Sequence, residues 1–130
     1  MNSAPAPLLA LLALLALLAA GVAGCNTPQI PLPPPEVEML EIALVDSQAQ
    51  TVRLSGAPNS RTRNAQVEVI NLATGFGVIA PGAADGAFVT EPLTAAEGHH
   101  LSVSYSREDD FSDALCIVVS YGAGQPAVCP

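Results

Sequence analysis

The sequence of 130 residues contains no lysine and no tryptophan, and it has only four arginines against twelve aspartates and glutamates in total. The net charge is −8, whereas nucleic-acid binding requires a cluster of basic residues, so this function is disfavoured. The negative charge also disfavours electrostatic adhesion to anionic lipid head groups. Without lysine, Schiff-base and lysine-base chemistry are excluded. An acidic balance of this kind is typical of an exported domain that is kept soluble by its charge.

Catalytic signatures are also missing from the sequence. It has no Gly-x-Ser-x-Gly, Ser-x-x-Lys or His-Glu-x-x-His pattern and no phosphate-cradling glycine loop. We therefore expect a protein that is not an enzyme and that uses no cofactor. Aromatic residues are few, with three Phe and two Tyr. The core must come mainly from Val, Leu, Ile and Ala, so a disulfide would help a small exported domain.

The apolar residues that are present gather first in a leader. Residues 1–24 carry no charge, and residues 8–20 are an unbroken run of Leu and Ala. A run of this length matches the apolar region of a signal peptide, about 7–15 residues. It is shorter than the roughly 20 residues that span a bilayer. We expect residues 1–24 to be a signal-peptide helix, with an uncleaved signal anchor as the alternative.

The leader is followed directly by Val22-Ala23-Gly24-Cys25. This tetrapeptide resembles the lipobox of bacterial lipoproteins, in which an aliphatic and two small residues precede the cysteine that receives lipid. The resemblance implies cleavage before Cys25 and membrane attachment through lipid on Cys25. Because Asn26 rather than Asp follows, it also favours the outer over the inner membrane of the cell envelope. The absence of Lys and Arg before the apolar run departs from the family pattern, and ordinary secretion is the alternative.

Proline dominates the next segment. Residues 26–35 contain five prolines, which exclude helix and sheet interior and favour an extended polyproline conformation. We therefore predict a lipidated cysteine and Pro-rich tether over residues 25–35, followed by one domain over residues 36–130.

The domain is predicted to be all-β, because short apolar runs alternate with turn signals. Residues 36–45 fit either a strand or a helical turn. The pair Asp85-Gly86 predicts a hairpin joining strands near Val78 and Phe88. In residues 101–105 the alternation places Leu101, Val103 and Tyr105 in the core. The other expected strands are residues 51–54, 65–72, 77–80, 87–90 and 114–121.

The order of these segments resembles that of bacterial immunoglobulin-like domains, which repeat in surface proteins and adhesins. The resemblance rests on a Val-x-Val-x-Asn-x-x-Thr-Gly stretch from Val67 to Gly75, an Asp-Gly-x-Phe turn at Asp85, and Gly-x-x-Leu-x-Val from Gly98. It implies a single immunoglobulin-like β-sandwich of about seven short strands and no catalytic residue. Carboxypeptidase-regulatory-like and transthyretin-like sandwiches are the alternatives.

Two groups of potential metal ligands stand out. Glu108, with Asp109, Asp110 and Asp113, crowds hard oxygen ligands of the type that Ca²⁺ prefers, although the spacing is not that of an EF-hand. The plainer interpretation is a solvated hairpin loop. The adjacent histidines 99 and 100 would point to opposite faces of a strand, so we expect no shared metal.

The cysteine count is odd, but lipidation of Cys25 would leave Cys116 and Cys129 as a pair. The chain between them reads as an apolar strand, a Gly-Ala-Gly turn and a second apolar stretch. Folding it about the bond after Gly122 places residues whose numbers sum to 245 opposite each other. We therefore predict a disulfide between Cys116 and Cys129 at a non-hydrogen-bonded site, with Pro126 at a sheet edge.

Taken together, these features predict a membrane-anchored, non-catalytic sandwich. We expect it to serve in cell-envelope structure or in binding a protein or glycan at the cell surface. The alternatives are a periplasm-facing assembly or stress accessory and a Ca²⁺-binding module.

Overall fold

The computed structural model describes residues 31–130, and one compact unit runs from Pro31 to Pro130. The expected signal peptide, Cys25 with its lipobox-like sequence and the first part of the tether lie outside the described residues. The described residues form two antiparallel β-sheets with no α-helix, which confirms the all-β prediction.

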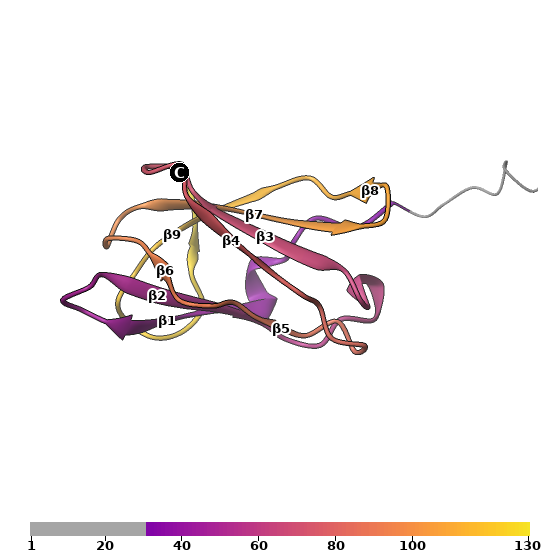
Figure 1. The fold of residues 1–130 in the computed structure, drawn as a ribbon, viewed down its shortest axis with the longest axis horizontal. Coiled ribbons are helices and arrows are strands. Elements are labelled where there is room, and N and C mark those ends of the chain that lie inside the picture. The colour runs from indigo at the N-terminus through magenta and orange to yellow at the C-terminus, as the bar shows by residue number, and fades with distance from the viewer. Residues whose placement is uncertain (1–30) are drawn as a thin grey trace, which may run out of the picture. The chain divides into compact units, whose positions relative to one another are not determined.

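The two sheets form the two layers of a sandwich (Figure 1). In the first, β2 pairs with β1 on one side and with the short β5 and β6 on the other. The second has the order β10-β9-β7-β3-β4, and β8 pairs with the end of β7. The elements are η1 (Val37–Met39), β1 (Leu40–Asp46), β2 (Thr51–Gly56), η2 (Ser60–Thr62), β3 (Gln66–Asn71), β4 (Gly77–Ala80), β5 (Phe88–Val89), β6 (Leu93–Thr94), β7 (His100–Arg107), β8 (Asp110–Phe111), β9 (Leu115–Val118) and β10 (Ala127–Val128).

Alternating side chains place one face of each long strand in the core. In β7, Leu101, Val103 and Tyr105 are buried as predicted, and the serines between them are half-buried on the outer face. The ambiguous residues 36–45 form the short 3-10 turn η1 followed by β1, so the strand interpretation holds from Leu40 onward. The fully buried side chains that fill the core include Ile42, Val52, Leu54, Val67, Val69, Leu101, Val103, Ile117 and Val119.

The described residues contain ten strands rather than about seven, because the two-residue strands β6, β8 and β10 lie outside the strand ranges expected from the sequence. Of these, β6 shares a partner with β5, since the two short strands pair with opposite ends of β2. Between them the Thr90 hydroxyl accepts a hydrogen bond from the Leu54 amide at 3.0 Å, in place of a backbone carbonyl. Pro92 then has no amide to donate. A side chain and a proline thus interrupt what would otherwise be one strand.

The connection between β4 and β5 corrects the hairpin prediction. Asp85-Gly86 does form a tight turn, in which Gly86 has a positive φ of +87°. However, β4 pairs with β3, whereas β5 pairs with β2 in the other sheet. The turn is held by the loop after β2, since the Asn59 amide donates to the Asp85 carbonyl at 2.9 Å. The turn signal specified a local reversal, but the chain uses it to cross between layers.

The C-terminal strand has the predicted register. Ala127 lies opposite Val118 and Val128 opposite Ile117, pairs that both sum to 245. The connection is not a tight hairpin, because the chain leaves the sheet after β9 and Gly124 pairs with Ile42 of β1. This bridge ties the C-terminal loop to the edge of the first sheet.

The N-terminal side of the domain begins earlier than the boundary expected at residue 36. Leu32 is only 4% exposed and belongs to the core cluster, and Pro35 is also buried. A proline has no amide hydrogen to donate within a β-ladder, but it does not prevent a neighbouring leucine side chain from packing in the core. The last part of the Pro-rich segment therefore belongs to the compact unit.

Candidate functional site

The acidic stretch 108–113 contains a hairpin turn and its second strand. Residues 108 and 109 connect β7 to β8, Arg107 lies opposite Asp110 at the base of the turn, and Asp113 follows β8. Within residues 31–130, Asp109, Asp110 and Asp113 do not bring three ligand oxygens into one group. The geometry therefore offers the Ca²⁺ alternative no assembled site.

The two neighbouring histidines have different roles. His99 belongs to the scaffold: its Nδ1 accepts a hydrogen bond from the Ala96 amide at 3.2 Å. The same Nδ1 lies 3.0 Å from Nδ2 of the fully buried Asn71. Because the Ala96 amide can only donate, Nδ1 is an acceptor and the ring proton lies on Nε2. Asn71 completes this network by donating to the Thr94 carbonyl at 3.0 Å.

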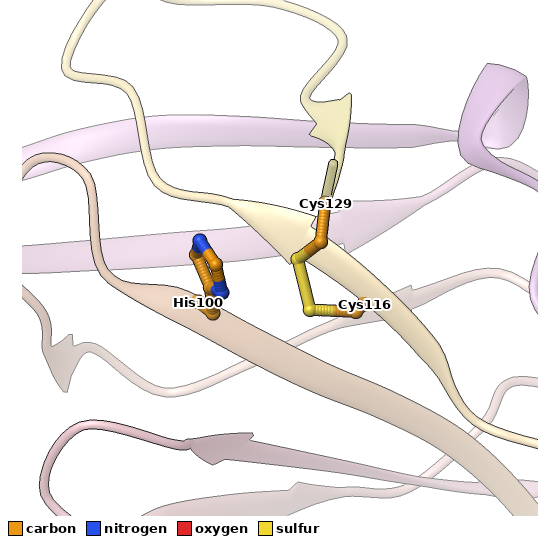
Figure 2. Close-up of side chains that lie close together, drawn as sticks. All are labelled: His100, Cys116 and Cys129. Atoms are coloured by element: carbon orange, nitrogen blue, oxygen red, sulfur yellow. A yellow bond between two sulfur atoms is a disulfide. The ribbon is translucent and has the colours of Figure 1, made fainter.

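His100, by contrast, is exposed at the start of β7, and its ring lies beside the two cysteines. Cys116 of β9 and Cys129, directly after β10, form a disulfide with their Cα atoms 5.4 Å apart. Figure 2 shows the imidazole next to the sulfur atoms. The ligand atoms of the three residues all lie within 4.8 Å of one another, and no other such group occurs in the described part of the chain.

The disulfide confirms the predicted pairing of Cys116 with Cys129, but the two residues form a hydrogen-bonded rather than a non-hydrogen-bonded strand pair. The Cys129 amide donates to the Cys116 carbonyl at 3.0 Å. The Cα separation agrees with a hydrogen-bonded pair, about 5.5 Å, rather than with the predicted non-hydrogen-bonded pair, about 4.5 Å. Pro126 lies just before β10, outside the ladder, as required of a residue that has no amide hydrogen.

A second candidate surface is the edge of the sandwich at β4 and the neighbouring β5, where exposed apolar side chains come from both sheets. Phe76, Ile79 and Val89 are 82%, 62% and 62% exposed. One shallow hollow of about 390 Å³ lies at the start of β4, lined by Thr74, Phe76, Gly77, Val78, Pro92, Leu93 and Thr94. Another of about 350 Å³ lies beyond its end, lined by Pro81, Gly82, Ala83, Ala87, Phe88 and Val89. We call these three exposed side chains and the two hollows the β4 surface.

The β4 strand is also a sheet edge. It terminates the second sheet, pairing with β3 alone among the described strands. An edge strand presents backbone amide and carbonyl groups to which another extended chain can pair. Apolar side chains beside such an edge are the feature that peptide-adding recognition sites use.

Tyr105 is a titratable side chain that is buried in the core. It packs edge-to-face against Phe88, with ring centroids 6.3 Å apart. Burial raises the pKa of Tyr105 above its usual value of 10.0, and the negative charge of Glu36 raises it further. Its hydroxyl therefore stays neutral well into the alkaline range.

Within residues 31–130, no helix is long and apolar enough to cross a membrane. Comparison of the chain with protein-family models, curated proteins and solved structures finds no match. The class of protein is therefore defined by the strands themselves: an all-β domain of two antiparallel sheets with a disulfide-linked C-terminal strand.

Two features of these surfaces were not predicted from the sequence. Nothing in the local pattern indicates that His100 lies near Cys116, because the contact depends on the register between β7 and β9. The exposure of Phe76 was not predicted either. The available signal was its position between the turn residue Gly75 and the first residue of β4.

Proposed function

We propose that this chain is a non-catalytic, lipid-anchored protein of the cell envelope whose sandwich binds a partner protein through the β4 surface. The exposed apolar edge is the observation that carries the binding function. Lipid attachment is supported by the lipobox-like sequence before Cys25. It is also supported by the pairing of Cys116 with Cys129, which leaves Cys25 as the remaining thiol.

We further propose that the sandwich is of the immunoglobulin-like type. One sheet contains β1, β2 and β5, and the other contains β9, β7, β3 and β4 in that order. The chain crosses between the sheets after β2, β4 and β6. This alternation of hairpins and crossovers supports a Greek-key sandwich of that class.

A protein partner is favoured over a glycan by the aromatic residues that the chain has. Sugars commonly stack on Trp and Tyr, whose rings combine an apolar face with a polar group, and this sequence contains no Trp and two Tyr. Tyr105 is buried, and the Tyr121 hydroxyl donates to the Ala95 carbonyl at 3.1 Å. The β4 surface instead offers aliphatic side chains, one Phe and backbone groups.

The chemistry of the surface also defines the partner segment. We propose an extended strand that pairs with β4 and inserts apolar side chains into the two hollows. Its flanks should be basic, because Glu68 lies opposite Ile79 in the sheet and Glu91 adjoins the first hollow. Both carboxylates are exposed, and the whole chain has a net charge of −8.

The experiment compares three forms of the full chain, each purified from membranes in detergent with crosslinked partners attached. The forms are the parent, Phe76→Ser combined with Ile79→Lys, and Phe111→Ser as the matched control. Phe111 is 74% exposed on β8, compared with 82% for Phe76, so its loss removes a similarly exposed ring from a different part of the fold. We expect a crosslinked protein that is present with the parent and the control but absent with the β4 double variant. Equal crosslinking in all three forms would contradict the proposal.

The location at the cell surface, on the outer membrane, is tested separately. Protease added to intact cells should remove the domain if it faces outward. Protection in intact cells with loss after permeabilisation would instead indicate the periplasm-facing accessory role.

A further inference from the structure

We infer that His100, Cys116 and Cys129 form a binding site for Zn²⁺ when the disulfide between the two cysteines is reduced. This site is separate from the β4 surface, and it does not depend on the proposed partner protein. It would give the C-terminal strand two alternative covalent or coordinate crosslinks, one in oxidising and one in reducing surroundings.

The positions of the three residues are set by adjacent strands of one sheet. His100 is opposite Val118, and Ser102 is opposite Cys116, so the histidine and Cys116 are diagonal neighbours across β7 and β9. Cys129 follows β10 on the other side of β9. Figure 2 shows the ring and both sulfur atoms gathered at one place. All three ligand atoms already lie within 4.8 Å of one another, so only small side-chain movements are needed to surround one ion.

The His100 ring is available for this role. Its imidazole makes no hydrogen bond with any described residue, and the ring is exposed. The neighbouring His99 is not available, because its Nδ1 is engaged by Ala96 and Asn71. Of these two residues adjacent in sequence, His99 is held by hydrogen bonds, whereas the ring of His100 is free to bind an ion and lies beside the sulfur atoms.

The donor set identifies the class of metal. Two thiolates and an imidazole are borderline-soft ligands, which select Zn²⁺ over hard ions such as Mg²⁺ or Ca²⁺. Three protein ligands leave the fourth tetrahedral position open. Because His100 is exposed and both cysteines are half-buried, water can reach that position.

The redox step balances with a dithiol as the reductant. The dithiol transfers two electrons and two protons to the Cys116–Cys129 bond, which becomes two thiols while the dithiol becomes a disulfide. Zn²⁺ then binds the two sulfur atoms as thiolates, and two protons are released. An oxidant that re-forms the disulfide would expel the metal.

The test uses the full chain in detergent with Cys25→Ser, so that Cys116 and Cys129 are its two thiols. The oxidised and phosphine-reduced forms are titrated with Co²⁺, whose thiolate complexes absorb in the near ultraviolet, and Zn²⁺ is then added to displace it. We expect a thiolate–Co²⁺ band in the reduced form alone and its loss on adding Zn²⁺. Absence of the band from the reduced, folded protein would overturn the inference.

The part played by His100 is tested with two substitutions in the same background. His100→Ala should weaken Zn²⁺ binding by about tenfold or more, since even outer-shell partners of a metal matter by that factor. His100→Cys supplies another soft ligand and should retain the affinity. Circular dichroism of each oxidised variant verifies that it is folded. Equal affinity of the parent and His100→Ala would remove the histidine from the site.

Discussion

At the scale of single residues, Asn71 does more than its place in a strand suggests. It is fully buried at the end of β3, yet each side of its amide is satisfied. Its Nδ2 reaches the Thr94 carbonyl and Nδ1 of His99, and its Oδ1 accepts from the Ala73 amide at 3.0 Å. One side chain thus joins the β3–β4 turn to β6 and to the start of β7. The asparagine within the Val-x-Val-x-Asn-x-x-Thr-Gly stretch has a structural reason in these bonds.

We predict that Asn71→Asp destabilises the domain strongly. The change replaces a donor with an acceptor that faces the Thr94 carbonyl and the His99 acceptor nitrogen, and it buries a charge. The free energy of unfolding should fall by about 3 kcal/mol, as unsatisfied buried groups cost about 1–3 kcal/mol each. Urea denaturation measures it. The exposed Asn64→Asp is the matched control and should change stability by less than about 0.5 kcal/mol.

Tyr105 provides a prediction on pH. Its folded-state pKa is raised by burial and by Glu36, so the folded protein holds the phenolic proton more tightly than the unfolded chain does. The associated stability is fully present below the unfolded pKa and is lost as the pH rises through the folded pKa. Tyr105→Phe keeps the ring contact with Phe88 but removes this proton. Urea unfolding at about pH 8 and about pH 11 should show a smaller alkaline loss for the variant than for the parent. Equal losses would contradict the assignment.

At the scale of elements, local signals in the sequence predicted the longer strands, but of the strand pairings they predicted only that of the C-terminal strand. The alternation of Leu101, Val103 and Tyr105 predicted both the strand and its buried face, because one face of a sheet must exclude water. The pairing of β4 and β5 with different sheets was not predictable from Asp85-Gly86. That choice depends on long-range packing and on the Asn59 hydrogen bond, which no short window of sequence contains.

The Gly86 turn allows conformational strain to be separated from crowding. A Cβ at Gly86 would meet the Asn59 carbonyl oxygen, whereas Gly98, with nearly the same φ of +86°, has open space there. Gly86→Val should therefore lower the free energy of unfolding by about 2 kcal/mol or more, through both effects. Gly98→Val should cost less, because only the backbone conformation is strained. Equal losses in urea denaturation would mean that the contact with Asn59 is unimportant.

The C-terminal strand depends on its crosslink more than on its length. The two residues of β10 contribute few ladder bonds, and both are exposed. We predict that Cys116→Ser with Cys129→Ser costs about 3 kcal/mol, the chain-entropy value for a loop of this size. The 13-residue separation sets that loop. The thermal midpoint should fall by roughly 10 °C or more, and an unchanged midpoint would show that the Gly124–Ile42 bridge holds the tail by itself.

At the scale of the whole molecule, the sequence and the structure support different proposals, one about residues 1–25 and the other about the domain from residue 31. The sequence alone carries the export and lipidation hypothesis, through the charge-free leader and Cys25. The structure carries the proposed binding surface, through the exposed Phe76 and Ile79 and the edge of β4. The sequence missed the second because exposure is a property of the folded sheet. A protein held on a membrane by one end and presenting an apolar sheet edge is suited to recruiting a partner to that membrane.

The central claim is the lipid anchor, and the mass of the intact mature protein tests it most directly. The protein should be extracted from membranes with detergent and measured before and after cleavage of ester-linked acyl chains. Our account predicts a chain of residues 25–130 with added diacylglyceryl mass on Cys25, and a Cys25→Ser protein that lacks this mass and leaves the detergent phase. A mature protein without acyl mass, or a Cys25→Ser protein that still partitions wholly into detergent, would contradict it.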